Sequence, residues 1–178
     1  MMNKNRKKIL AISGSTRSNS TTETLLNVIA KLSKENLEIH IYSKIAELPH
    51  FNPDLDTEEA PQIITEFREL VKASDGVIIC TPEYVFSLPG TLKNALEWTV
   101  STTVFSDKPV GLIVASLGGE KAYESLILIM ETLGAKIPND AKLLIQGSRS
   151  KVSQEGKITD SDTLQKIHQL INTFINYG

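Results

Sequence analysis

The residues best suited to chemistry in this sequence form a polar loop ahead of a helical segment. After the apolar run 8–13, the chain continues Gly-Ser-Thr-Arg-Ser-Asn-Ser-Thr-Thr-Glu over residues 14–23. Ser20 followed by Glu23 fits a capping box, so a helix N-terminus with free backbone N–H groups should open here. These donors, nearby hydroxyls and the Arg17 guanidinium predict a phosphate site, to which the helix dipole adds about 0.3–1 kcal/mol. A capped polar loop with a solvated Arg17 is the alternative interpretation.

This loop differs from two common nucleotide-binding motifs. A Walker loop requires Gly-x-x-x-x-Gly-Lys-Ser/Thr, and a dinucleotide fingerprint requires Gly-x-Gly-x-x-Gly after the first strand. Neither pattern is present here. We therefore expect neither a nucleoside triphosphate nor a dinucleotide bound in the Rossmann manner.

A second candidate loop reads Thr-Pro-Glu-Tyr-Val-Phe-Ser-Leu-Pro-Gly over residues 81–90. Its two prolines and its glycine fix the course of the chain, which lowers the entropy cost of holding the loop against a flat ligand. The simpler interpretation is a rigid turn in which Tyr84 and Phe86 pack locally.

The sequence offers no set of side chains for acid–base or metal catalysis. His-Glu-x-x-His, Cys-x-x-Cys and Gly-x-Ser-x-Gly are absent, and the three histidines lack metal-ligand spacing. His50, in the irregular segment 49–54, is the one histidine for which a role in a cleft stays open. Cys80 is the only cysteine, and its apolar neighbours indicate an inert core thiol. We predict no catalytic side chain and no metal site.

Alternating strands and helices should position the two loops. Short β-branched runs predict buried strands at 8–13, 76–81 and 110–116, with weaker candidates at 37–42 and 141–145. Apolar residues at helical spacing predict helices over 22–33, 61–73, 90–100, 121–133 and 160–176, the last capped by Thr159, Asp160 or Ser161. This alternation indicates an α/β fold with helices on both faces of a parallel sheet. The irregular stretch 43–60 is of a length that is usually functional.

The order of the strands decides whether the two loops meet. If the sheet is doubly wound in the order 2-1-3-4-5, ligands bind outside the carboxyl ends of the first and third strands, where the order reverses. The polar loop follows the first of these strands and the proline-rich loop follows the third. Together they would form a pocket for a phosphorylated, planar molecule.

Length and composition limit the possible partners. With 178 residues we expect a single domain over 1–178, and 40% hydrophobic with 22% charged residues is an ordinary globular composition. Nineteen Lys and Arg against 21 Asp and Glu leave a net charge of −2 without a basic stripe, so we expect no nucleic-acid or membrane partner. The apolar runs are too short for a membrane helix or a signal peptide, which favours the cytoplasm.

Four motifs belong to a likeness that spans nearly the whole chain, from Lys8 to the fifth predicted strand. They are Gly14-Ser15-x-Arg17-x-x-Ser20, Leu48-Pro49-x-Phe51-Asn52-x-Asp54, Thr81-Pro82-Glu83-Tyr84-x-x-Ser87-x-Pro89-Gly90-x-Leu92-Lys93-Asn94-Ala95-Leu96-Glu97-Trp98, and Ser116-x-Gly118-Gly119. This set resembles the NADPH-dependent FMN reductase family, which includes quinone, azo-dye and chromate reductases. The resemblance implies a flavodoxin-like three-layer sandwich with a five-stranded parallel sheet in the order 2-1-3-4-5.

The resemblance also implies a cofactor site. The residues that would hold the FMN phosphate are Ser15, Arg17, Ser20, Thr21 and Thr22. Those that would border the isoalloxazine are Pro82, Glu83, Tyr84, Val85 and Ser87, with Ser116, Gly118 and Gly119 closing its other side. Thr22 stands where the family often has Asn but still offers a hydroxyl. Val85 also replaces a frequent Asn and keeps only its backbone donor.

The activity implied by the resemblance is that of an FMN-dependent NAD(P)H oxidoreductase. Hydride would pass from NADPH or NADH to flavin N5 and then, by ping-pong kinetics, to a small acceptor such as a quinone, azo compound, metal oxyanion or free flavin. Family members resemble dimers or paired dimers, so the apolar run 126–130 would serve a homodimer or homotetramer. A helix that is simply buried under the last one is the alternative interpretation of this run. A flavodoxin-type carrier or a non-catalytic FMN-binding module are the alternatives. Yellow protein without turnover would indicate the carrier, and colourless protein that ignores FMN would indicate the module.

Overall fold

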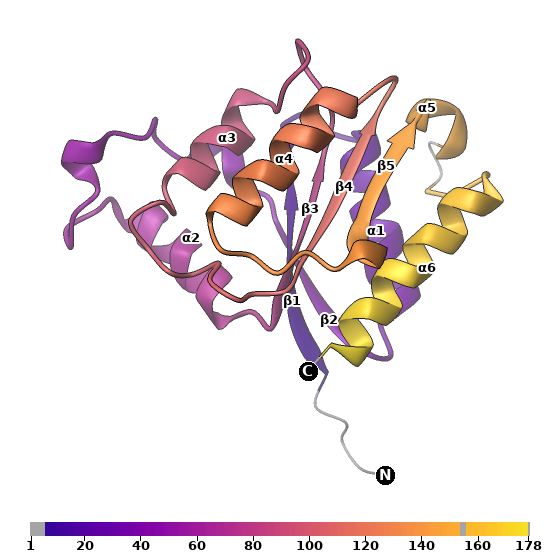
Figure 1. Cartoon of the computed structure of the whole chain (residues 1–178), viewed down its shortest axis with the longest axis horizontal. Coiled ribbons are helices and arrows are strands. Elements are labelled where there is room, and N and C mark those ends of the chain that lie inside the picture. Colours follow the sequence, from indigo (N-terminus) through magenta and orange to yellow (C-terminus); the bar gives the residue numbers. More distant parts are fainter. Residues whose placement is uncertain (1–5, 154–155, 178) are drawn as a thin grey trace.

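The computed structural model describes residues 6–153 and 156–177 and is built on one parallel sheet (Figure 1). Its strands are β1 (Lys7–Ser13), β2 (Leu37–Tyr42), β3 (Gly76–Thr81), β4 (Val110–Ser116) and β5 (Lys142–Gln146). They lie in the order β2-β1-β3-β4-β5, and every neighbouring pair is parallel. The predicted fold class and strand order are confirmed.

Helices cover both faces of the sheet. They are α1 (Thr21–Ser33), α2 (Gln62–Ala73), α3 (Gly90–Glu97), α4 (Glu120–Thr132), α5 (Ser148–Lys151) and α6 (Ser161–Asn176). Helices α1 and α6 pack on one face, and α2, α3 and α4 pack on the other (Figure 1). The predicted helices are present with ends shifted by a few residues, and Asp160 is the cap of the last one. The short helix α5 was not predicted.

Alternate residues of each central strand enter two separate cores. Leu10 and Ile12 of β1 belong to the core under α2, α3 and α4, whereas Ile9 and Ala11 belong to the core under α1 and α6. Because both faces are covered, the middle of each central strand is apolar at successive positions rather than at every second one. Cys80 lies in the second core with no exposed surface, and burial raises the pKa of its thiol far above the ordinary value. The expected core position of this cysteine is confirmed.

Two motif residues on or beside α3 hold the irregular segment 43–60. The Asn94 side chain accepts from Phe51 N at 2.7 Å and donates to Pro49 O at 2.9 Å. The Trp98 indole donates to the same Pro49 carbonyl at 2.7 Å, and its ring meets Phe51 edge-on at 5.1 Å. These contacts explain why the motif carries an amide and an indole at this spacing.

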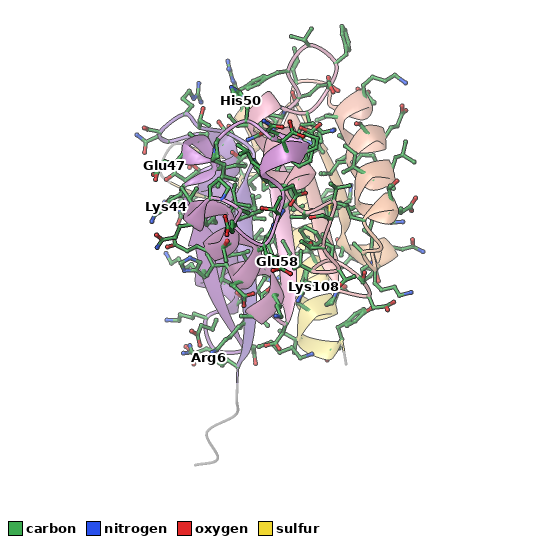
Figure 2. The ribbon with its side chains drawn as sticks, turned by 90° about the vertical axis from the view of Figure 1, so that its left-hand side faces the viewer. Arg6, Lys44, Glu47, His50, Glu58 and Lys108 are labelled. Carbon is green, nitrogen blue, oxygen red and sulfur yellow. The ribbon has the colours of Figure 1, made fainter. Side chains whose placement is uncertain are left out.

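An ion pair fixes the far end of the same segment. Arg68 of α2 contacts Asp56 at 2.5 Å, with both side chains nearly buried, and its Nε donates to Trp98 O at 2.7 Å. The outward side of the segment is polar: Lys44, Glu47, His50 and Glu58 lie exposed on this side of the molecule (Figure 2).

The Asn94 bonds predict a loss of stability on truncation. In Asn94→Ala, the Phe51 N–H and the Pro49 carbonyl lose partners in a partly buried place, so the free energy of unfolding should fall by about 1–3 kcal/mol. Urea denaturation followed by circular dichroism measures the change. Asn27→Ala, at an exposed position on α1, is the matched control and should stay within about 0.5 kcal/mol of wild type. Equal effects of the two variants would contradict the anchoring role of Asn94.

Candidate active site

The loops after β1 and β3 touch at the carboxyl edge of the sheet. Gly14 N donates to Cys80 O at 2.8 Å. A Cβ on Gly14 would lie 2.3 Å from Thr81 Oγ1, a distance that no side chain permits. Glycine is therefore required where the polar loop leaves β1, and the two predicted loops lie side by side.

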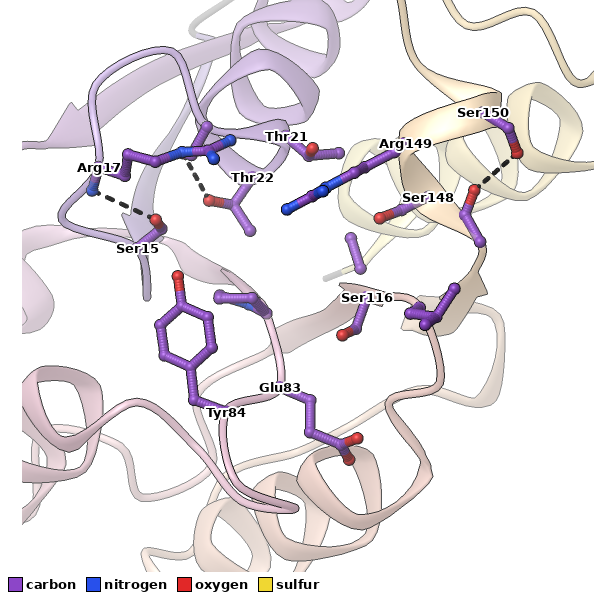
Figure 3. A pocket seen from close by; sticks show the side chains of 15 residues that line it. Ser15, Arg17, Thr21, Thr22, Glu83, Tyr84, Ser116, Ser148, Arg149 and Ser150 are labelled. Atoms are coloured by element: carbon purple, nitrogen blue, oxygen red, sulfur yellow. Dashed lines mark hydrogen bonds between the residues drawn. The ribbon is translucent and has the colours of Figure 1, made fainter.

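A cavity of about 450 Å³ opens above this contact (Figure 3). Its described lining comes from the carboxyl ends of the strands and from the chain that follows β1, β3, β4 and β5. The lining residues are Ser15, Arg17, Ser20, Thr21, Thr22, Pro82, Glu83, Tyr84, Ala115, Ser116, Leu117, Gly147, Ser148, Arg149 and Ser150. Its size falls within the roughly 300–1,000 Å³ typical of small-molecule and cofactor sites.

Most of the predicted cofactor residues line this cavity, and four do not. The residues outside the lining are Val85, Ser87, Gly118 and Gly119. Val85 is 96% exposed at the tip of its loop. The backbone N–H of Ser87 donates to Tyr84 O, and that of Gly119 donates to Glu83 Oε1, so both donors are already used within the protein. His50 is also outside the lining, as is the whole segment 43–60, which was expected to be functional.

The start of α1 offers unsatisfied backbone donors. Ser20 Oγ accepts from Glu23 N at 3.2 Å, as the capping box predicts. The Glu23 carboxylate, however, accepts from Asn19 N at 3.0 Å and not from Ser20 N. Within the described chain, no hydrogen bond uses the N–H groups of Ser20, Thr21 or Thr22. A helix N-terminus with free donors is suited to an anion.

Three hydroxyls of the polar loop, those of Ser15, Ser20 and Thr22, form hydrogen bonds within the protein. Thr22 is buried, and its Oγ1 lies 3.1 Å from Ser13 Oγ and 2.9 Å from Ser20 Oγ. Ser15 Oγ accepts from Arg17 N at 3.3 Å. These bonds stiffen the loop, so that Thr22 is placed to contribute its backbone N–H rather than a free hydroxyl.

The cavity carries positive charge that the protein does not neutralise. The Arg17 guanidinium has no ion pair or hydrogen bond among residues 6–153 and 156–177, and the same holds for Arg149. Arg149 lies on α5 and was missed in the sequence. The Ser-Arg-Ser that follows the predicted strand 141–145 was a signal for it, since every strand of a parallel sheet ends at this edge.

Glu83 links the loops on the two sides of the cavity. Its Oε1 accepts from Gly119 N at 3.2 Å and its Oε2 accepts from Ala122 N at 2.9 Å. Gly119 has a φ of +108° and supplies no side-chain cap, so Glu83 caps α4 from another loop. A carboxylate at a helix N-terminus is favoured by the dipole. Figure 3 shows the Glu83 carboxylate turned toward this helix and away from Arg17 and Arg149.

The tip of the proline-rich loop is strained. Tyr84 and Ser87 exchange backbone hydrogen bonds of 3.0 Å around the two-residue turn Val85–Phe86. Both turn residues have positive φ, +51° and +55°, which is rare for β-branched and bulky side chains. Turns with this geometry favour Asn and Gly. Val85 and Phe86 are 96% and 78% exposed, so burial does not compensate the strain.

The strain predicts a stabilising substitution. Asn tolerates the left-handed region better than Val, so Val85→Asn should raise the free energy of unfolding by about 1 kcal/mol. Urea denaturation is the measurement. Val100→Asn, at another exposed valine (61%) that lacks a positive φ, should bring no gain. If the free energy of unfolding rises in both variants, the cause is the polarity of Asn and not the relief of backbone strain.

Other kinds of site find no support in the described residues. No group of three His, Cys, Asp or Glu side chains among them is placed to hold a metal ion. None of their helices combines the length and the apolar character needed to cross a bilayer.

Known proteins resemble this chain in both sequence and fold. The family model described as NADPH-dependent FMN reductase matches residues 7–149. The NADH:(hydroxy)cinnamate reductase subunit CrdA of Vibrio ruber is 31% identical over 93% of this chain and 84% of its own length. A quinone reductase of Escherichia coli K12 is 28% identical, with 93% and 92% covered. The solved structure of FerB, an NAD(P)H:(acceptor) oxidoreductase from Paracoccus denitrificans, is similar with a TM-score of 0.83 and 28% identity over 96% of both chains.

Proposed function

We propose that this chain reduces quinone-like acceptors at the cavity described above. The chain belongs to the NADPH-dependent FMN reductase family and is an FMN-dependent NAD(P)H oxidoreductase of flavodoxin-like fold. One observation carries the assignment of the site: free backbone donors and an unpaired guanidinium lie beside a stiff loop at the point where the strand order reverses. The relatives named above for quinone and acceptor reduction support the choice of acceptor.

The residues present fit FMN. The N–H groups of Ser20, Thr21 and Thr22, together with Arg17, suit its phosphate. The walls formed by Pro82 to Tyr84 and by Ser116 and Leu117 leave space for its ring. When bound, FMN supplies the hydride chemistry, while the protein supplies binding, orientation and electrostatics. Glu83 contributes by fixing one wall against the other through the start of α4.

The mouth of the cavity suits an apolar, planar acceptor. Tyr84 and Leu117, on two different loops, line the cavity and are 52% and 88% exposed. Val85 and Phe86 extend the apolar surface beyond Tyr84. Contacts with such side chains favour a flat ring over a charged, compact molecule. We therefore propose quinones as the acceptor class, with NADPH or NADH as the donor.

Flavin binding and turnover test the proposed function. The wild-type protein should bind FMN with sub-micromolar affinity, since roughly 0.3 kcal/mol for each of about 31 non-hydrogen atoms gives on the order of 9 kcal/mol. It should then oxidise NADPH or NADH when benzoquinone is added. Arg17→Ala should weaken FMN binding by about 10–100-fold, because a hydrogen bond to a charged group contributes about 1.5–3 kcal/mol.

The outcomes separate the alternatives. FMN binding without steady-state quinone reduction would favour a single-electron carrier. Protein that does not bind FMN would be a non-catalytic module. An unchanged FMN affinity in Arg17→Ala would contradict the phosphate assignment while leaving the activity intact.

We also propose that the chain self-associates through the outer side of α4. In the predicted patch 126–130, Leu126 and Met130 are buried, whereas Leu128 is 65% exposed and Ile127 and Ile129 are partly exposed. Large exposed aliphatic side chains on one helix face support a homodimer or homotetramer. The single domain over 1–178 and the cytoplasmic location also stay predictions.

Sedimentation equilibrium tests the association. Wild type should sediment as a dimer or tetramer at micromolar concentration, and Leu128→Lys should shift it toward monomer because the charge would be desolvated in the interface. Leu32→Lys, at a leucine of α1 that is 43% exposed, is the control and should leave the assembly intact. A monomeric wild type would overturn the proposal.

A further inference from the structure

The second guanidinium in the cavity has no part in the function described so far. Arg149 projects from α5 into the space between Thr21 and Ser116 (Figure 3). It belongs to the loop after β5, whereas Arg17 belongs to the loop after β1. Residues from opposite sides of the cavity thus bring two positive charges to one ligand space.

Neither charge is balanced by the protein. Lys151, two residues beyond Arg149, lies 3.9 Å from Asp160, but Arg149 itself has no such partner in the described chain. Among the described residues that line the cavity, Glu83 is the one acidic residue, and both of its oxygens accept bonds from the start of α4. Two uncompensated guanidinium groups facing one cavity repel each other, and a bound anion relieves that repulsion.

The turn that carries Arg149 is anchored. Gly147 N donates to Leu117 O at 3.1 Å, which ties the turn to the loop after β4. Ser150 Oγ donates to Gly147 O at 2.8 Å, and Thr159 N donates to Lys151 O at 2.9 Å. Ser148 is buried beneath it. Arg149 therefore extends from a backbone that is fixed relative to the cavity.

We propose that Arg149 is a second phosphate-binding residue, which with Arg17 and the α1 N-terminus holds a phosphomonoester dianion. The inference rests on the proposed function and commits to the phosphate of FMN, because Arg149 lines the same cavity as the free N–H groups of Ser20, Thr21 and Thr22. Two guanidinium groups match the double charge of a phosphomonoester, and each can donate two parallel hydrogen bonds to its oxygens. The consequence is selectivity for FMN over riboflavin.

Titration of flavin-free protein with FMN and with riboflavin, followed by flavin fluorescence, tests the proposal. Arg149→Gln should weaken FMN binding by about 10–100-fold and leave riboflavin binding within twofold, because only FMN carries the phosphate. Arg149→Lys should recover part of the loss, since it restores the charge without the planar fork. Arg6→Gln, which removes an exposed arginine from the opposite edge of the sheet, is the control and should change neither affinity.

Three results would overturn the role of Arg149. They are an FMN affinity within twofold of wild type in Arg149→Gln, an equal loss for FMN and riboflavin, and a change confined to the KM for NADPH relative to NADH. The last would assign the guanidinium to the nicotinamide nucleotide's phosphate. If the wild-type protein does not bind FMN, the proposed cofactor is wrong and so is the role of Arg149. If only the Arg149 variants behave unexpectedly, the role of Arg149 is wrong and the proposed cofactor stands.

Discussion

The site depends on a backbone contact that leaves no room for a side chain. Gly14 lies against Thr81, and its N–H donates to the carbonyl of Cys80. This contact brings the chain leaving β1 against the chain leaving β3 at the point where the strand order reverses. Donors for an anion and a stiff wall for a flat ring thereby share one cavity, although they come from distant parts of the sequence. A methyl group at residue 14 would separate them.

Many of the motif's polar side chains position the backbone and leave the ligand to other groups. Glu83 caps α4 from the loop after β3, Thr22 bonds to neighbouring serines, and Asn94 holds a segment outside the site. Among the described residues, the groups left free include the N–H groups at the start of α1 and the guanidinium groups of Arg17 and Arg149. Backbone donors have little conformational freedom to lose, so a site built from them is organised before the ligand arrives. The reaction itself is left to the cofactor.

The periodicity of the sequence predicted the sheet and its helices because burial on both faces makes strands such as 76–81 continuously apolar. The same reasoning predicted that the two loops meet. It missed α5 and Arg149, since a four-residue helix has no measurable period. Sequence reasoning could not orient the Glu83 side chain, because its hydrogen-bond partners come after another strand. It also did not predict the positive φ values of Val85 and Phe86, since no Asn-Gly pair marks the turn. The capping box correctly predicted that Ser20 Oγ accepts from Glu23 N. The Glu23 carboxylate, however, accepts from the N–H of Asn19, one residue before the one predicted.

The position of Cys80 keeps the one thiol of the chain away from oxidants. Its carbonyl accepts the Gly14 N–H that joins the two loops of the site, yet its sulfur lies on the α1 and α6 side of the sheet with no exposed surface. Sulfenic acid formation and mixed disulfides require an accessible thiolate, and burial keeps this sulfur protonated. As the sequence has no other cysteine, an oxidant in the cavity would reach no exposed thiol. The resistance of this thiol to oxidation thus follows from the way β3 is packed.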